Sequence, residues 1–312
     1  MDNFLICLNA VLPLVFTMLL GFSARRLGML GEREVIRMNK TAFFFFMPCL
    51  LFHNIYKADL SVAIQPRLLI FALISVLVIY LLTLPIILLS EKEHHNRSAV
   101  LMSIYRSNST MVGLPIAASL VSASDISTAA VLIAVVAVFY NILAVITFSF
   151  LDGRHTRPLT LFASILKNPL IVGSLLGILF AYFGWRLPSA VAGVVSSLSA
   201  MSSPLLLFLL GAFFRFDSVG KYRHELVLSC VGRLIVIPAL VLPLAWLMGF
   251  RDMQFAALIA IFAPSSAINS FTMAQQMGGN AELIGDTIVL SSILCPLTIF
   301  FWSMLAKSMG VI

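Results

Sequence analysis

Charged residues are scarce in this chain of 312 residues. Asp, Glu, Lys and Arg make up only 11% of it and hydrophobic residues make up 61%, whereas about a quarter of the residues in a soluble domain are charged. This composition excludes an ordinary soluble domain and indicates a membrane protein with many transmembrane segments. The net charge of +7 does not indicate nucleic-acid binding, because the basic residues lie in short connections between apolar segments and form no patch.

The sequence also lacks the motifs of metal sites and membrane enzymes. Its cysteines are scattered through apolar segments without CxxC or Cys/His spacing, so we expect them to serve as packing residues: Cys7, Cys49, Cys230 and Cys295. The chain has no HExxH helix, no pair of in-span Asp residues and no carboxylate and Arg cluster, which a zinc protease, an intramembrane aspartic protease or a phospholipid transferase would need. We therefore predict that the protein is not an enzyme and holds no metal cofactor.

Ten apolar segments are predicted to cross the bilayer. They are residues 4–24, 41–56, 68–90, 98–121, 127–150, 162–183, 188–213, 226–249, 254–278 and 283–306. Thirteen Lys and Arg residues fall in the odd-numbered connections and five on the other side, which predicts that both termini are extracytoplasmic. The first segment has neither a basic N-terminal region nor a small-residue cleavage site, and is expected to be a retained span. We expect a multi-pass protein of the plasma or inner membrane, in contact with lipid.

The chain repeats itself at half its length. An offset of 156 residues aligns two proline pairs, whereas about 0.3 proline matches are expected by chance for 13 prolines in 312 residues. The aligned positions are Pro13 with Pro169, Pro48 with Pro204, Gly21 with Gly177, Gly28 with Gly184, and residues 50–52 (LLF) with 206–208. Five spans in each half reverse the orientation of the second half, so residues 1–156 and 157–312 are predicted to be inverted repeats.

Polar residues and helix breakers interrupt the fourth and ninth spans, at residues 106–115 (RSNSTMVGLP) and 263–270 (APSSAINS). Free backbone at membrane depth is tolerated only where protein buries it or where it lines a cavity. Each break leaves a half-helix N-terminus with unpaired N–H groups, which favours anions such as carboxylates. Interrupted helices at corresponding positions of two inverted halves indicate the binding site of a transporter.

These breaks supply the candidate substrate-binding residues, which are Asn108, Ser109, Gly113, Pro115, Pro264, Ser265, Ser266 and Asn269. The Asn108 amide either caps the broken helix or donates to a substrate carboxylate, and the two roles are compatible. The prolines are either ordinary kinks or the matched breaks of the repeat. The ninth-span polar residues either join helices or line the site, and Ser265 and Asn269 rank above Gln275 because they lie one turn apart on one face. We expect the fourth span to supply the amide and the ninth the hydroxyls.

Further candidates lie inside the spans. Arg106 and Arg233 either snorkel to the membrane surface or supply positive charge for an anion. Asp286 is considered for proton coupling, the alternative being a solvated carboxylate favoured by the helix dipole. Tyr140 and Asn141 either line the cavity or form a packing pair.

The break residues also carry a family resemblance. Asn108-x4-Gly113-Leu114-Pro115 resembles the fourth-span crossover of the auxin efflux carrier family, and residues 263–266 (APSS) resemble its ninth-span counterpart. Residues 167–169 (KNP) and 204–211 (PLLLFLLG) are also similar to the family's pattern. The resemblance covers essentially the whole chain. It implies an all-α membrane protein with ten transmembrane helices in a five-plus-five inverted repeat and crossing broken helices in spans four and nine.

The family also implies a scaffold of spans one, two, six and seven, which could form a homodimer, and a mobile transport unit of spans three to five and eight to ten. It implies elevator-type alternating access and a small organic anion as substrate: auxin in plant members, malonate or malate in some bacterial ones. The short connection 152–167 lacks the long hydrophilic loop of many plant members and favours the bacterial branch.

The sequence is compatible with more than one coupling ion and more than one mode of action. Few carboxylates lie near the hydroxyls and amides of the breaks, so coupling to H⁺ or facilitated transport is favoured over coupling to Na⁺. The alternatives are a sodium-coupled symporter of the bile-acid type, and a channel or non-transporting receptor of the same fold.

Overall fold

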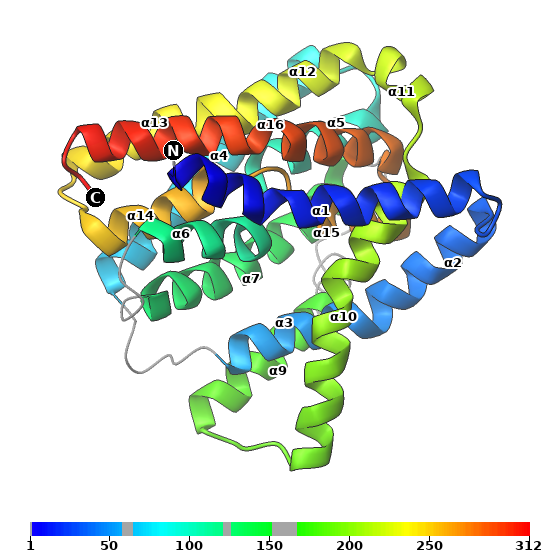
Figure 1. The fold of residues 1–312 in the computed structure, drawn as a ribbon, viewed down its shortest axis with the longest axis horizontal. Helices are drawn as coiled ribbons and strands as arrows, with labels where there is room; N and C mark the ends of the chain where they lie inside the picture. The colour runs from blue at the N-terminus through cyan, green and yellow to red at the C-terminus, as the bar shows by residue number, and fades with distance from the viewer. Residues whose placement is uncertain (1, 58–64, 121–125, 152–166) are drawn as a thin grey trace.

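The computed structural model describes residues 2–57, 65–120, 126–151 and 167–312 (Figure 1). In this part of the chain every regular element is helical, and the extended backbone is limited to one isolated bridge. The α-helices are α1 (Asp2–Arg26), α2 (Glu32–Thr41), α3 (Met47–Tyr56), α4 (Pro66–Ser90), α5 (His94–Tyr105), α6 (Leu114–Leu120), α7 (Ile126–Leu151), α9 (Pro169–Phe183), α10 (Ser189–Phe213), α11 (Phe216–Lys221), α12 (Arg223–Val231), α13 (Ile237–Leu247), α14 (Asp252–Phe262), α15 (Asn269–Met277) and α16 (Ala281–Ser308). Three π-helical segments join some of them: η1 (Ala42–Phe46), η2 (Ser109–Gly113) and η4 (Gly232–Val236).

Seven helical segments of the described residues are long and apolar enough to cross a membrane. They are Leu8–Arg26, Glu32–Tyr56, Pro66–Ser90, Ser127–Leu151, Ser189–Phe213, Arg223–Leu247 and Ala281–Ser308. Three shorter apolar helices, Ser109–Leu120, Pro169–Phe183 and Asp252–Phe262, overlap parts of the predicted fourth, sixth and ninth spans. The multi-pass, all-helical class is confirmed, and the count of ten spans stays a prediction. Parts of the predicted fourth and sixth spans, residues 121 and 162–166, lie outside the described residues.

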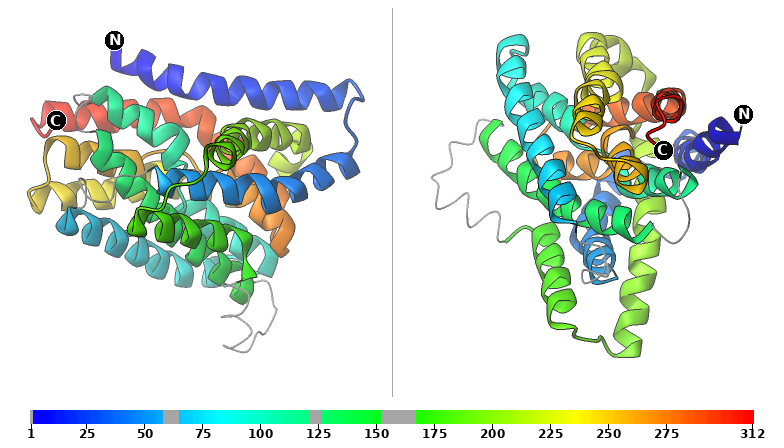
Figure 2. Two further views of the ribbon diagram at one scale, coloured as in Figure 1. Left: turned by 90° about the horizontal axis from the view of Figure 1, so that it is seen from below. Right: turned by 90° about the vertical axis from the view of Figure 1, so that its left-hand side faces the viewer.

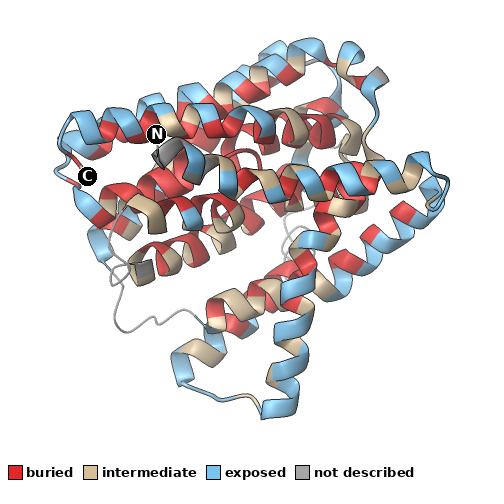
Figure 3. Cartoon of the chain, in the orientation of Figure 1, coloured by how far each residue is buried: buried red, intermediate tan, exposed pale blue. Residues whose placement is uncertain are grey.

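The surface of the long helices is apolar. Large hydrophobic side chains are exposed along α4, α9, α10 and α13, among them Leu89 (88% exposed) and Leu247 (72%). The outward turns of α9, α10 and α13 are pale blue in Figure 3. Such a surface is unfavourable in water and suits contact with lipid tails. By contrast, every residue of α14 from Phe255 to Phe262 is at most 4% exposed. The predicted ninth span therefore starts in the core, enclosed by the other helices.

The helices pack in two groups, which contact each other mainly where α1 lies against α16. α1 packs along α10, and α3 packs against both α9 and α10, with α9 and α10 projecting from the remaining helices in Figure 2. In the second group, α14 contacts α7, α6 and α13, while α5 contacts α4, α12 and α16. Glycines allow close packing in the first group, because a Cβ atom at Gly21 would overlap the carbonyl oxygen of Phe208, and one at Gly211 that of Met18.

Candidate functional site

Two interrupted helices meet at the centre of the molecule. α5 ends at Tyr105 and helical structure resumes at Ser109, while α14 ends at Phe262 and resumes at Asn269. Each interruption leaves carbonyl groups at the end of one helix and N–H groups at the start of the next. Buried backbone N–H and C=O groups need hydrogen-bond partners. Groups at the breaks that have no partner within the protein are available to a ligand.

The two breaks provide part of these partners for each other. Ser107 and Ser266 form an isolated antiparallel bridge. The Asn108 backbone N–H donates to the carbonyl oxygen of Ser265 (2.9 Å), and the Ser266 hydroxyl donates to a carbonyl of α5, that of Ser103 (2.6 Å). The two segments predicted from their polar residues thus lie side by side.

A small cavity of about 50 Å³ lies beside the bridge. The predicted residues that line it are Arg106, Asn108, Ser109, Tyr140, Asn141 and Asn269. A second cavity of about 270 Å³ adjoins it, shares Asn54 and Thr110 in its lining, and extends to Lys57 at the end of α3. Since one water needs about 10–15 Å³ by this measure, the first cavity has room for a carboxylate group and the second for the remainder of a small organic molecule.

Arg106 is the charged group of the first cavity. Its side chain is buried and therefore does not snorkel to the membrane surface. Its guanidinium donates to the Asn141 side-chain oxygen and to the Met273 sulfur (2.8 Å), and it makes no ion pair with any described carboxylate. A thioether is a weak acceptor, and a guanidinium has five N–H donors. Arg106 consequently retains donors for another acceptor.

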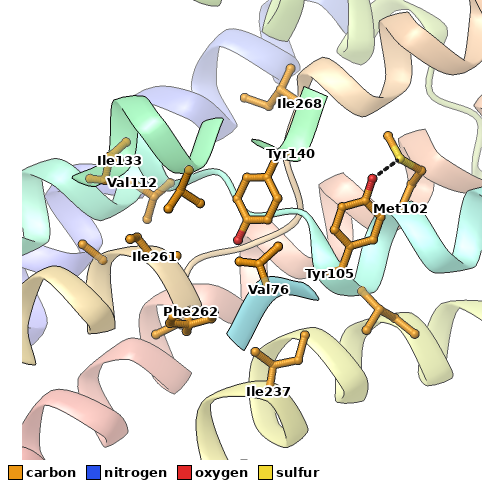
Figure 4. Packing of buried hydrophobic residues seen from close by; sticks show 14 of the residues in the cluster. Val76, Met102, Tyr105, Val112, Ile133, Tyr140, Ile237, Ile261, Phe262 and Ile268 are labelled. Carbon is orange, nitrogen blue, oxygen red and sulfur yellow. Dashed lines mark hydrogen bonds between the residues drawn. The ribbon is translucent and has the colours of Figure 1, made fainter. Parts of the chain in front are cut away.

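Other buried donors around Arg106 also lack partners. The side-chain nitrogens of Asn108 and Asn141 and the hydroxyl of Ser107 make no hydrogen bond in the structure. The hydroxyl of Tyr140 lies near Arg233 without a well-aligned hydrogen bond, and its ring packs beside that of Tyr105, with 6.0 Å between ring centroids (Figure 4). Leaving buried donors unpaired costs free energy. All four residues belong to the lining of the first cavity.

The ninth break contributes differently from expectation. The hydroxyl of Ser265 accepts from that of Ser292 (3.3 Å), and the Ser266 hydroxyl is used by α5, so neither lines the cavity. The cavity is lined instead by Asn269 and the two residues before it. The hydroxyls that the ninth span was expected to supply therefore do not face this cavity, because at a break the side chains no longer follow one helical face. That Ser265 and Ser266 bind the substrate stays a prediction.

The predicted glycine and prolines act on the backbone. Gly113 packs against α14 so closely that a Cβ atom would overlap the carbonyl oxygen of Ala260. Pro115 is exposed on α6, and the carbonyl of Pro264 accepts a hydrogen bond from Arg233 (2.8 Å). None of the three lines the cavity. Their contacts are consistent with a structural role, in which they determine the backbone conformation at the two breaks.

The two other charged candidates lie outside the cavity. Arg233 is fully buried and donates to backbone carbonyls. Asp286 is 1% exposed, so it is not the solvated carboxylate of the alternative interpretation, and it accepts a hydrogen bond from the Ser218 hydroxyl. The buried Arg233 side chain therefore does not snorkel to the membrane surface.

The sequence interpretation missed several polar residues of the lining: Asn54, Ser107, Thr110 and Ser203. Ser107 and Thr110 lie within the segment 106–115 that was singled out. Asn54 could have been found as an amide inside the apolar second span, where a polar side chain needs a partner. Ser203 carries no comparable signal, since serine is frequent in membrane helices.

Comparison with known proteins extends over nearly the whole chain. A family model described as membrane transport protein matches residues 6–160 and 154–303. The chain is similar to an uncharacterized transporter of Methanothermobacter thermautotrophicus, with 25% identity over 313 residues that cover 95% of this chain and 97% of the relative. It is also similar to an uncharacterized transporter of Methanocaldococcus jannaschii, with 21% identity over 305 residues, covering 96% of this chain and 98% of the relative.

Proposed function

The chain belongs to the membrane transport protein family, as its resemblance to the auxin efflux carriers predicted, and on this basis we propose that it is a secondary transporter of a small organic anion, such as a mono- or dicarboxylate. The anion binds in the cavity between the two breaks. The observation that supports this most directly is Arg106, a buried guanidinium with free donors and no carboxylate partner among the described residues. A buried unpaired charge is costly, and a bound carboxylate would offset that cost.

The lining favours an anion over a cation or a neutral solute. A carboxylate accepts hydrogen bonds from a guanidinium in a bidentate arrangement, and the unpaired amides of Asn108 and Asn141 are further donors. Ser109 and Asn269, the first residues of η2 and α15, also line the cavity, so two helix N-termini with their partial positive charge face it.

The arrangement of the helices supports a five-plus-five inverted repeat with spans four and nine crossing at their breaks. α4 and the α12–α13 segment begin 157 residues apart, at Pro66 and Arg223, and α5 and α14 end 157 residues apart, at Tyr105 and Phe262. The glycine contacts recur too: Gly21 meets Phe208, and Gly177 meets Phe52, each partner 156 residues away from its counterpart. We propose the repeats 1–156 and 157–312 on these grounds.

The two packing groups support an elevator mechanism. The group of α1, α3, α9 and α10 corresponds to the scaffold that the family resemblance implies, and the helices around α14 and α5 correspond to the transport unit. In this mechanism the cavity moves with the transport unit between the two faces of the membrane. The second cavity, which extends to Lys57, would be the path to the face predicted to be extracytoplasmic.

Uptake into proteoliposomes tests the proposal. Purified protein reconstituted into liposomes is expected to take up radiolabelled mono- or dicarboxylates in a saturable manner, and Arg106→Ala liposomes with matched protein content are the control. Flux with and without a pH or sodium gradient identifies the coupling ion. Rapid flux of small inorganic ions that does not saturate would favour a channel and contradict the transporter proposal.

A ligand panel narrows the substrate class. A ligand stabilises the state that binds it, so the carboxylate that fits the cavity is expected to raise the melting temperature of the detergent-solubilised protein. Arg106→Ala should remove this shift. A protein that binds carboxylates but never transports them in liposomes would instead be a receptor.

A further inference from the structure

Arg233 is a buried charged residue that does not line the proposed anion cavity. It lies in η4, the π-helical segment between α12 and α13, and its side chain is completely buried. Its guanidinium donates to five backbone carbonyls, those of Pro264 (2.8 Å), Ile261 (2.9 Å), Phe262 (3.1 Å), Ile104 (3.3 Å) and Tyr105 (3.3 Å). Since an Arg side chain has five N–H donors, every donor has a partner.

Four of the five carbonyls belong to the ends of two helices, and the fifth, that of Pro264, follows two residues after α14. Ile104 and Tyr105 are the last residues of α5, and Ile261 and Phe262 the last of α14. A helix C-terminus carries about half a negative charge, so the two ends together carry roughly the charge that one guanidinium neutralises. The charge of Arg233 is balanced by helix dipoles, with no carboxylate among the acceptors of its five hydrogen bonds.

The local sequence brings Arg233 to this place. Gly232 precedes it, and a Cβ atom there would come within 3.2 Å of the Ile104 side chain, so glycine lets η4 approach the end of α5. Pro238 follows within the next turn of α13, and its missing N–H fits the widened helical turn before it.

Carbonyl oxygens at broken-helix ends are the ligands with which transporters bind coupling cations such as Na⁺. In this protein the carbonyl oxygens at the ends of α5 and α14 accept hydrogen bonds from the guanidinium of Arg233, which is a cation that belongs to the chain itself. We propose that Arg233 takes the place of a coupling metal ion, holding the C-terminal ends of α5 and α14 together so that the N-terminal ends of η2 and α15 face the anion cavity. Transport is then independent of Na⁺. The inference rests on the proposed function and names Arg233 as a positioning residue of its site.

The wild-type protein supplies the first test. Carboxylate uptake into proteoliposomes is measured with Na⁺ on both sides and with Na⁺ fully replaced by K⁺ or choline. We expect equal initial rates and equal half-saturating substrate concentrations in the three media. A saturable requirement for Na⁺ would overturn the inference and leave the transporter proposal standing, whereas no carboxylate uptake in any medium would contradict the proposed function itself.

Substitution of Arg233 supplies the second test. Arg233→Ala removes the cation and leaves a space lined by carbonyls, and we expect uptake to fall by about tenfold or more. Free guanidinium at non-denaturing concentration, present from solubilisation onwards, should occupy this space and raise the melting temperature of the variant by about 2–4 °C. Tetramethylammonium, which cannot donate hydrogen bonds, should not.

Arg251→Ala is the matched control. Arg251 also donates to backbone carbonyls, those of Trp246 in the last turn of α13 (2.9 Å) and of Phe250 in the following connection (2.7 Å), but it is exposed and lies directly before α14. This variant and the wild type should show no stabilisation by guanidinium. Equal stabilisation of all three proteins, or full uptake by Arg233→Ala without guanidinium, would overturn the inference.

Arg233→Lys covers the case in which the alanine variant does not fold. An ammonium group keeps the positive charge and three donors, so this variant is expected to retain at least about a tenth of the wild-type uptake and its independence of Na⁺. Uptake by Arg233→Lys that becomes dependent on Na⁺, or a folded but inactive Arg233→Lys protein, would contradict the role of Arg233 as the attached cation.

Discussion

Two buried arginines at the same pair of helix breaks have opposite surroundings. All five donors of Arg233 are paired with backbone carbonyls, whereas Arg106 donates only to one amide oxygen and one sulfur and lies against a cavity. Burial of a charge inside a membrane span therefore does not by itself indicate a binding site. A binding site is indicated where hydrogen-bond donors of a buried charge have no protein partner and lie beside a cavity.

The same distinction separates the polar residues of the two breaks. The Ser265 and Ser266 hydroxyls of the ninth break have protein partners, while the Asn108 amide nitrogen of the fourth break has none. The fourth break and Asn141 of α7 thus supply unpaired donors to the cavity, whereas the Ser265 and Ser266 hydroxyls are used within the protein. This difference can be tested by mutating, separately, the residues with unpaired donors and the residues whose hydroxyls have protein partners.

The largest effect on uptake at the cavity is expected for Arg106→Ala. Removing a buried charged partner of a ligand costs about 2–5 kcal/mol, so uptake of the carboxylate should fall by about 30-fold or more. The melting temperature without ligand should change little, because Arg106 has few strong partners to lose. Arg106→Lys, which keeps the charge, should recover part of the uptake, and an Arg106→Ala protein with at least half of the wild-type rate would remove Arg106 from the site.

A smaller effect is expected for Asn108. Loss of one hydrogen bond to a charged ligand costs about 1.5–3 kcal/mol, so Asn108→Ala should reduce uptake by about tenfold or more while expression is maintained. Asn108→Asp should be worse, because its carboxylate would repel the substrate and pair with Arg106. Initial rates at matched protein content provide the measurement. Wild-type rates in both variants would show that the anion binds elsewhere.

Ser266→Ala is expected to affect stability more than uptake. It leaves the carbonyl of Ser103 without its donor, which costs about 1 kcal/mol, so the melting temperature should fall, while uptake per folded protein changes by less than about twofold. The two quantities are measured on the same preparation. A loss of uptake as large as that of Asn108→Ala, without a change in melting temperature, would return the ninth-break hydroxyls to the binding site.

The sequence was sufficient to predict where the helices break, but not what each side chain faces. Proline, glycine and polar residues in an apolar span indicate a break directly, and the segments 106–115 and 263–270 do meet. At a break the helical period no longer relates neighbouring residues, so the orientation of Ser265 and Asn269 could not be obtained from their spacing. The partners of Arg106 and Arg233 come from other helices, and their difference depends on tertiary packing alone.

The start of the second span also depends on tertiary contacts that the local sequence does not reveal. The second span was predicted to begin at residue 41, whereas the helical segment begins at Glu32. Residues 32–41 (EREVIRMNKT) are too polar for a hydropathy pattern to include them. Within them, Asn39 is fully buried because its side chain donates to Gln275 (2.6 Å) and accepts from Thr272 (2.8 Å), both on α15.

The smallest effect is expected for Asp286→Asn. Asp286 lies outside the cavity, and an asparagine oxygen can accept the hydrogen bond of Ser218 as the carboxylate does. Uptake at neutral pH should therefore change by less than about twofold, and its dependence on pH between 5 and 8 should match that of the wild type. The measurement is the initial rate across this range with a fixed pH gradient. A flattened pH profile in Asp286→Asn, with binding of the carboxylate unchanged, would identify Asp286 as a proton carrier and extend the functional site beyond the two breaks.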